Sequence, residues 1–550
     1  MIPHWTRIAA LFVGGHLLAC GDAPAAKTDT APADDTAPAD DTAAPSPPPS
    51  GLVLNELMPI NDSTVMDDDG DFPDWLELYN GGKETIELSR ITLQDTSDAT
   101  WTGGDGSIAP GEHLMLWADD TEDSTDRLPF QLSGSGETVD LLIDGAVVDS
   151  VTTDALEGDV TWARHPDGGE WSPSIHATPD ATNPDAPSES ADPRSIFFQR
   201  EEVLEYRLYV PEKDLETLDL GLMPEVMGSL EFEGIRFEQV GIRLKGGGSY
   251  RHLDGKPAFK VDLNEYVSGQ RLRGLKGLTF NNANQDPTTT HEYITYALFR
   301  AAGVPAARIG FANLWLNDEL YGLYVHFEDF DDLFLEQWFD QHEEVHLWEG
   351  AKNDWSEIRS PTNYEYEEGP GEDMTLMDEI CGDFFVDPLD ETAMDTWSAG
   401  VDMDAFLAMN AMDALTMNND GYQHVHNFYV YRTADALWGW ISTGADYSWD
   451  GSDYYGPYGG QGNHFGWFLQ NPEWEAAYNQ ALRDAADLAE KSDLPGLFDE
   501  LIEFLDPHFT ADPRKEHTIA DIAQGREETR NYLENRPADL RELVAAREKK

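Results

Sequence analysis

The 550-residue chain is predicted to be multidomain, with an all-β sandwich followed by an α+β domain. Three observations predict this division. Short apolar strands separated by Gly, Asp and Pro fill residues 51–183, mixed strand and helix patterns fill residues 196–550, and a stretch rich in Pro, Ser, Ala and Asp at 184–195 lies between them. We therefore expect two folded domains joined by a linker.

Residues 1–19 are predicted to be a lipoprotein signal peptide. Arg7 supplies a positive charge, and the apolar run after it is shorter than the roughly 20 residues that span a bilayer. The motif Leu17-Leu-Ala-Cys20 resembles a bacterial lipobox, which implies lipidation of Cys20. Gly21 gives no signal for inner-membrane retention, so the resemblance implies an outer-membrane lipoprotein of the bacterial cell envelope, periplasmic or surface-exposed. An ordinary secretory signal is the alternative.

Residues 20–50 are acidic and rich in Pro, which predicts a disordered tether. The formal charge of the chain is -71, which argues against nucleic acid and anionic lipid surfaces as partners and leaves membrane contact to the lipid anchor. High acidity also keeps a surface protein soluble in salty surroundings. Apart from Cys20 the chain has one cysteine, Cys381, so we expect buried apolar surface rather than a disulfide to stabilise the fold.

In the first domain we expect strands at 52–57, 75–79, 86–91, 113–117 and 139–143. The motifs Leu54-Asn-Glu-Leu-Met58, Asp74-Trp-Leu-Glu-Leu-Tyr-Asn80 and Arg164-His-Pro-Asp-Gly168 resemble the lamin-tail domain. The resemblance implies an immunoglobulin-like sandwich with an accessory, non-enzymatic role. The run Asp67-Asp-Asp-Gly-Asp71 has the oxygen ligands that Ca²⁺ prefers, but its spacing does not fit an EF-hand loop and favours a solvated turn.

The second domain begins with strand patterns and continues with helices. We expect strands at 206–210, 232–244, 259–263, 278–281, 314–316 and 322–327, and helices at 212–220, 287–302, 406–417 and within 480–547. An acidic insertion at about 354–400 is predicted to be a surface excursion, and the helices after residue 480 form a C-terminal extension.

Three polar residues follow the predicted helix 406–417 at loop and strand-end positions. Asp420 fits a carboxylate that orients an acceptor hydroxyl, while Asn427 and Asp446 fit an amide and a second carboxylate that bind metal at nucleotide phosphates. No Lys or Arg occurs from residue 360 through 431, so ATP could bind here only with Mg²⁺ or Mn²⁺. The alternative is a set of ordinary turn and strand-end residues.

A glycine-rich turn supplies the opposite charge. In Gly246-Gly-Gly-Ser249, the backbone at Gly247 and Ser249 can approach phosphate oxygens closely, although such a run alone is more often a flexible hairpin tip. Fixed positive charge near it comes from three lysines, two of which share one face of a strand: Lys245, Lys256 and Lys260. Glu292, at the start of the next helix, fits an ion pair with one of them or a plain helix-start carboxylate.

Ordered motifs over about 197–451 resemble the spore-coat-protein-H (CotH) kinase family. They include Arg243-Leu-Lys-Gly246, residues 256–262, residues 298–305, Tyr321-Gly-Leu-Tyr324 with Glu328, and residues 418–431. The resemblance implies an atypical protein-kinase-like fold that transfers the γ-phosphoryl group of ATP to Ser or Thr hydroxyls of surface or secreted proteins. It implies Asp420 as catalytic, Asn427 and Asp446 as metal ligands, and a nucleotide site that includes Glu328.

Two positions depart from the pattern of that family. His291 stands where Arg is more common, and Gly444 stands where a carboxylate is usual, which predicts weaker phosphate and metal contacts. Two alternatives also remain open. An His-x-His pair, His424 and His426, placed on one face of a strand would suit zinc in a metallohydrolase, and the kinase-like fold could serve a non-catalytic adhesion or assembly lipoprotein.

Overall fold

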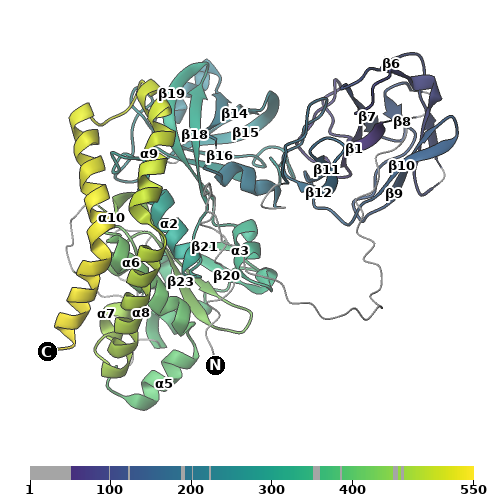
Figure 1. The fold of residues 1–550 in the computed structure, drawn as a ribbon. Coiled ribbons are helices and arrows are strands. Elements are labelled where there is room, and N and C mark those ends of the chain that lie inside the picture. Colours follow the sequence, from purple (N-terminus) through teal and green to yellow (C-terminus); the bar gives the residue numbers. More distant parts are fainter. Residues whose placement is uncertain are drawn as a thin grey trace, which may run out of the picture. The chain divides into compact units, whose positions relative to one another are not determined.

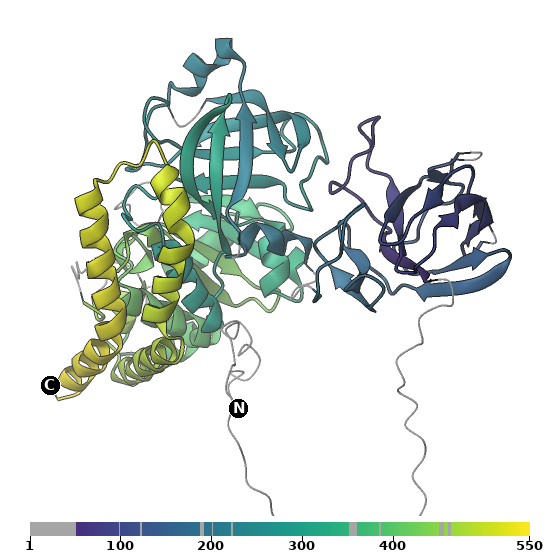
Figure 2. The ribbon, with the colours of Figure 1, turned by 45° about the horizontal axis from the view of Figure 1, so that its top comes forward.

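The computed structural model describes residues 51–549 except 98, 122–123, 188–191, 201, 222–223, 351–359, 384–386, 450–455 and 460–463. The chain divides into two compact units between Pro193 and Arg194, within the predicted linker (Figures 1 and 2). The predicted signal peptide, the lipidation at Cys20 and the tether lie outside the described residues.

Within these ranges, none of the helices combines the length and the apolar character needed to cross a membrane.

The first unit is all-β, as predicted. One sheet has the order β12-β11-β1-β2-β7-β8 and the other β10-β9-β4-β5, while β3 and β6 form a small ribbon. The strands are β1 Leu52–Met58, β2 Asp74–Asn80, β3 Ile86–Glu87, β4 Ile91–Gln94, β5 Thr100–Thr102, β6 Ser107–Ile108, β7 His113–Ala118, β8 Arg127–Leu128, β9 Thr138–Ile143, β10 Ala146–Thr152, β11 Thr161–His165 and β12 Glu170–Ser174. Apolar residues from both sheets form one core, including Leu54 and Leu76 on one side and Leu93 and Leu141 on the other. The predicted strand 86–91 is divided, because a 3₁₀ turn at Leu88–Arg90 carries the chain from the ribbon to β4.

Polar residues of the lamin-tail motifs form a buried network rather than a surface site. A bulge in β1 places Asn55 so that its Nδ2 donates to Glu77 Oε1 at 3.0 Å and to Asp167 Oδ1 at 3.1 Å. Burial raises the pKa of Glu56 to about 7 and that of Glu77 to about 8. The unit therefore contains two carboxyl groups that burial favours in the protonated form.

The acidic turn at 67–71 is organised by Asp67. Its carboxylate accepts hydrogen bonds from the backbone of Asp69 and Asp71, both at 3.0 Å, and pairs with Arg127 at 2.9 Å. Within this predicted solvated turn, the charge of the buried Asp67 carboxylate is therefore offset by Arg127.

The second unit starts with a closed barrel of seven strands in the order β13-β14-β15-β16-β17-β19-β18. Its elements are β13 Leu204–Tyr209, α1 Glu212–Leu218, β14 Glu225–Phe232, β15 Ile235–Lys245, β16 Ala258–Asp262, β17 Gly277–Asn281, β18 Ile309–Leu316 and β19 Glu319–Phe327. Strand β13 runs parallel to β18 and closes the barrel. The predicted strand 232–244 is instead part of a hairpin, because Glu233 and Gly234 adopt positive φ angles and turn the chain between β14 and β15.

The rest of this unit combines a four-stranded sheet, β21-β20-β22-β23, with helices. Its elements are α2 His291–Ala301, α3 Asp332–Trp338, β20 His346–Gly350, β21 Tyr364–Glu368, α4 Leu376–Asp378, α5 Glu391–Ala399, α6 Met403–Thr416, β22 Phe428–Arg432, β23 Trp438–Ser442, α7 His464–Phe468, α8 Pro472–Lys491, α9 Leu494–Ala511 and α10 Ile519–Arg547. Helix α6 packs on α8 and β23, and the turn between α9 and α10 lies beside the barrel (Figures 1 and 2).

The predicted insertion at 354–400 is part of the fold where it is described. Strand β21 forms the edge of the four-stranded sheet, and Met377, Ile380, Met394 and Trp397 are buried in the main core. The prediction of a surface excursion is therefore wrong for these residues, because acidic composition on one face hid an apolar face on the other.

Candidate functional site

The glycine-rich turn follows directly from the end of β15 at Lys245. Gly246 has a φ of +99°, and a Cβ there would collide with the Ser249 hydroxyl, so a side chain would not fit. The neighbouring Gly247 and Gly248 face open space. The turn therefore presents accessible backbone next to the half-buried Lys245.

Lys245 lies among three acidic groups. Burial lowers its pKa, while the charges of Glu292 on α2, Asp329 and Asp446 raise it. Burial, and then the charge of Asp446, raise the pKa of Glu292 to about 8, against the opposing charge of Lys245. Asn281 on β17 fixes the Glu292 carboxylate by donating a hydrogen bond of 2.8 Å to Oε2. Of the three lysines, Lys245 is the one whose charge acts on Glu292, and the ion pair between them stays a prediction.

The start of α2 is tied to the turn that carries Asp446. Asp286 accepts hydrogen bonds of 2.7 Å from the backbone N–H groups of Thr288 and His291. His291 is buried, and its Nδ1 lies 3.2 Å from the carbonyl oxygen of Asp446 while its Nε2 lies 2.9 Å from the hydroxyl of Thr529 on α10. A carbonyl only accepts, so Nδ1 donates to Asp446, while Nε2 lies between the Thr529 hydroxyl and, at 3.4 Å, Asp286 Oδ1. His291, which departs from the family pattern, therefore links α2 to the Asp446 turn and to α10.

Asp420 and Asn427 contact each other in the loop between α6 and β22. Asn427 Nδ2 donates to Asp420 Oδ2 at 2.7 Å and to the Asp420 carbonyl oxygen at 2.9 Å. On the other carboxylate oxygen, His426 Nδ1 lies 3.0 Å from Oδ1. The side chain of Asp420 remains 27% exposed, so an oriented carboxylate is open to a reactant.

Asp446 lies in a 3₁₀ turn after β23 and is 7% exposed. Burial, followed by the negative charges of Asp420 and Asp286, raises its pKa to about 7, against the charge of Lys245. Just before it, Gly444 has a φ of +72°, and a Cβ there would lie 2.6 Å from Asn427 Nδ2 and 2.9 Å from the Asp420 carbonyl oxygen. Gly444 is thus the residue that lets the two loops approach, and the weaker metal contact expected from its missing carboxylate stays a prediction.

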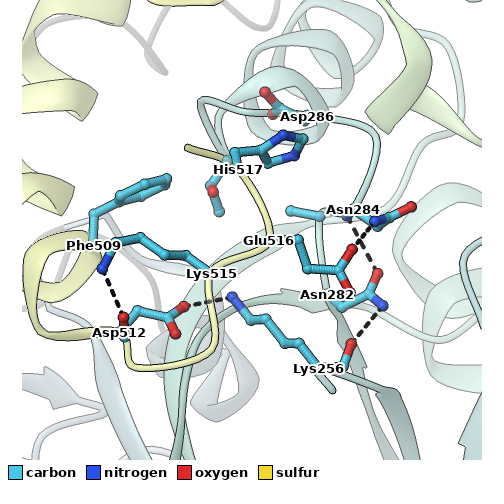
Figure 3. Close-up of a pocket in the computed structure, with 11 residues that line it drawn as sticks. Lys256, Asn282, Asn284, Asp286, Phe509, Asp512, Lys515, Glu516 and His517 are labelled. Atoms are coloured by element: carbon cyan, nitrogen blue, oxygen red, sulfur yellow. Dashed lines mark hydrogen bonds and ion pairs between the residues drawn. The ribbon is translucent and has the colours of Figure 1, made fainter. Parts of the chain in front are cut away.

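The remaining predicted nucleotide residues are engaged in ion pairs. Lys260 on β16 lies 3.5 Å from Asp329 and is 37% exposed. Glu328 is buried and pairs with Arg308 at 2.6 Å. Lys256 is buried and pairs with Asp512, from the turn between α9 and α10, also at 2.6 Å (Figure 3).

Lys256 and Asp512 line a pocket between the barrel and the α9–α10 turn (Figure 3). Polar side chains dominate its other walls: Asn282, Asn284, Asp286, Thr289, Lys515, Glu516 and His517. Lys256 therefore faces this junction and not the cluster of Lys245, Glu292 and Asp446.

The prediction that His424 and His426 share one face of a strand is wrong. His424 ends a 3₁₀ turn at Tyr422–His424, Val425 has a φ of +61°, and β22 starts only at Phe428. Over the described stretches of the chain, no three or more His, Cys, Asp and Glu side chains converge as a metal-binding group. Zinc in proteins takes at least three such ligands, so the zinc alternative loses its geometric basis.

Mg²⁺ makes a different demand on a protein. It is usually held by one or two carboxylates together with substrate phosphates and waters. Asp420 and Asp446 repel each other, and the adjacent Asn427 adds an amide oxygen. This donor set fits Mg²⁺ or Mn²⁺ that arrives with a phosphate ligand.

A buried carboxylate near this loop was missed by the sequence analysis. Asp413 on α6 accepts hydrogen bonds from Ser442 at the end of β23 and from Asn418 in the Asp420 loop. The available signal was an acidic residue inside an otherwise apolar helical run.

Comparison with protein families identifies both units. A family model described as CotH kinase protein matches residues 242–540, which is more than half of the chain and includes every site residue discussed above. A model described as Lamin Tail Domain matches residues 45–155 in the first unit. No curated protein matches the chain.

Proposed function

The chain belongs to the CotH kinase family, and from this premise we propose that it is an exported atypical protein kinase that transfers the γ-phosphoryl group of ATP to Ser or Thr hydroxyls. The observation that carries the proposal is the association of two groups of side chains. Lys245, Glu292 and Asp446 interact electrostatically, and the negative charge of Asp420 raises the pKa of Asp446. A hydrogen bond from Asn427 orients the Asp420 carboxylate. A lysine, its acidic partner, a catalytic carboxylate and metal ligands are the components that phosphoryl transfer uses.

Each residue has a distinct task in this proposal. The exposed carboxylate of Asp420, fixed by Asn427, orients the acceptor hydroxyl and accepts its proton. Lys245 supplies positive charge to the non-reacting phosphates, and the open backbone at Gly247 lies next to it in the chain. Asp446 and Asn427 would hold Mg²⁺ or Mn²⁺, whose charge offsets that of the phosphates when bound.

We further propose that the protein is an outer-membrane lipoprotein of the bacterial cell envelope, anchored through Cys20 and acting on surface or secreted proteins. The lipobox motif and the charge of -71, which disfavours nucleic acid and anionic lipid, support it. Metabolic labelling with a fatty acid tests the anchor: label should enter the wild type and be lost in Cys20→Ser, and equal labelling of both proteins would contradict the anchor.

A phosphotransfer assay tests the activity. The purified full chain is incubated with γ-labelled ATP, Mg²⁺ or Mn²⁺ and a mixed Ser/Thr acceptor such as dephosphorylated casein. Loss of a positioned general base or metal ligand should lower incorporation by about 10²-fold or more in Asp420→Asn and Asp446→Asn. Asp435→Asn, an exposed carboxylate in the turn between β22 and β23, is the matched control and should keep wild-type activity.

Two results would contradict the kinase proposal. One is no incorporation by the wild type with either metal, which would favour the non-catalytic adhesion or assembly protein. The other is incorporation that persists undiminished in both site variants, which would move the activity to another place or to a contaminant.

A further inference from the structure

Asp413 is a buried carboxylate with neutral hydrogen-bond donors. It lies near the end of α6, is 2% exposed, and accepts from two side chains and from the backbone of Gln423. Burial raises its pKa to about 7, because no charged group offsets the loss of water around it. Because burying this carboxyl group costs free energy, we expect its hydrogen bonds to have a specific structural role.

The hydrogen bonds of Asp413 form a directed chain. Ser442 Oγ donates to Asp413 Oδ2 at 2.9 Å and in turn accepts from the backbone N–H of Tyr422 at 3.0 Å. On the other side, Asn418 Nδ2 donates to Asp413 Oδ1 at 3.3 Å and to the carbonyl oxygen of Thr443 at 2.9 Å. The single hydroxyl proton of Ser442 points to the carboxylate, so Asp413 determines the orientation of the whole chain.

The partners of this chain flank the proposed reacting groups. Asn418 and Tyr422 lie two residues before and two residues after Asp420, and Ser442 ends the strand that leads through Gly444 to Asp446. The space inside this network is also filled, because a Cβ at Gly421 would collide with both the Ser442 hydroxyl and the Asn418 amide. One buried carboxylate therefore contacts both segments that carry the site.

We propose that Asp413 is a positioning residue that fixes the Asp420 loop and the Asp446 turn relative to each other, with Ser442 and Asn418 as its two arms. The consequence for activity rests on the proposed kinase function, whereas the ordering of the two segments does not. Loss of Asp413 leaves the hydroxyl of Ser442 and the amide of Asn418 without their common acceptor, so both segments gain alternative conformations.

The test compares Asp413→Asn and Ser442→Ala with Asp404→Asn, an exposed acidic residue in the first turn of the same helix. Ser442→Ala removes one arm and leaves the helix unchanged, so it answers the question if Asp413→Asn fails to fold. Two readouts are used: hydrogen exchange of residues 418–424 and 442–447 in the full chain, and the Mn²⁺ concentration that gives half-maximal phosphotransfer.

We expect exchange in both segments to rise about tenfold in the two network variants and to stay at the wild-type rate in Asp404→Asn, as loss of one buried hydrogen bond implies. We also expect a lower kcat together with a higher Mn²⁺ requirement, whereas a merely destabilised fold would lower the active fraction without changing that requirement.

Unchanged exchange in Ser442→Ala would overturn the inference, as would an unchanged Mn²⁺ requirement in an active protein. A wild type with no phosphotransfer would defeat the proposed function alone, because the exchange measurement would still decide the role of Asp413.

Discussion

Replacing Lys256 by Met separates two roles for this lysine. The sequence predicts that it binds ATP phosphates, whereas in the structure its Nζ lies 2.6 Å from Asp512 Oδ2, with the two side chains 7% and 3% exposed. A buried pair that loses one partner leaves an uncompensated charge behind. We therefore expect Lys256→Met to destabilise the second unit and to leave nucleotide affinity nearly unchanged.

The size of the effect follows from what remains around Asp512. Breaking a buried ion pair costs about 3 to 5 kcal/mol. Asp512 keeps hydrogen bonds from the backbone N–H groups of Leu323 at 3.1 Å and Arg514 at 2.7 Å, which continue to stabilise its charge. The expected loss is thus at the lower end, about 3 kcal/mol, and the double variant with Asp512→Leu should recover part of it, because no charge is left buried.

Urea unfolding measures the stability change, and titration calorimetry with ATP and Mn²⁺ measures affinity. Lys213→Met serves as the control, since Lys213 is 82% exposed in a 3.7 Å pair with Asp214, and its loss should change the free energy of unfolding by no more than about 0.5 kcal/mol. Full stability combined with lost nucleotide binding in Lys256→Met would refute the structural role and restore the phosphate-binding prediction.

Three further changes test other parts of the structure. Gly444→Asp should lower the free energy of unfolding by about 1 to 2 kcal/mol from the positive φ alone, and it should weaken Mn²⁺–ATP binding. The control Gly382→Ala, whose Cβ meets open space, should change neither quantity. Tighter metal binding in Gly444→Asp would contradict this role of Gly444. His291→Leu should lower the free energy of unfolding in urea by about 1 to 3 kcal/mol, because the carbonyl oxygen of Asp446 loses its hydrogen-bond donor. The loss should exceed that of Thr529→Val, which removes only the contact to Nε2. Equal losses would argue against His291 as the donor to Asp446. Folding raises the pKa of Glu77 from 4.5 to about 8, so between these pH values the folded lamin-tail unit binds a proton that the unfolded chain releases. The contribution of Glu77 to stability should therefore be greatest below pH 4.5 and be lost as the pH rises through about 8. Hydrogen exchange of the strands measures this stability, which should depend less on pH in Glu77→Gln.

The extent of successful prediction differs between the fold and the site. Short runs of clustered or alternating apolar residues between turn residues predicted β1, β2, β7 and β9 within one or two residues; β9 alternates between buried and half-buried positions, whereas β1 is buried along its whole length. The predicted strand at 232–244 ran through the turn before β15 and missed nearly all of β14, since the turn depends on the φ angles of two residues and not on composition. The edge strand β21 was missed because its acidic residues resemble a solvated loop.

The sequence by itself determined the order of the two domains and their families, and it selected Glu292, Asp420, Asn427 and Asp446, together with three alternative lysines, as candidate site residues. Residue types and local spacing suffice for that, because each group lies in a short motif with its own pattern.

Only the tertiary structure decided which of three lysines joins the acidic groups. Lys256 and Lys260 were predicted to share one face of a strand, but Lys256 precedes β16, and Asp512, which lies more than 250 residues away in the chain, neutralises it. The same holds for Asp413, Ser442 and Gly444, whose roles arise from contacts between loops. A one-dimensional pattern records what a residue is, whereas charge compensation and close approach depend on which distant segment folds against it.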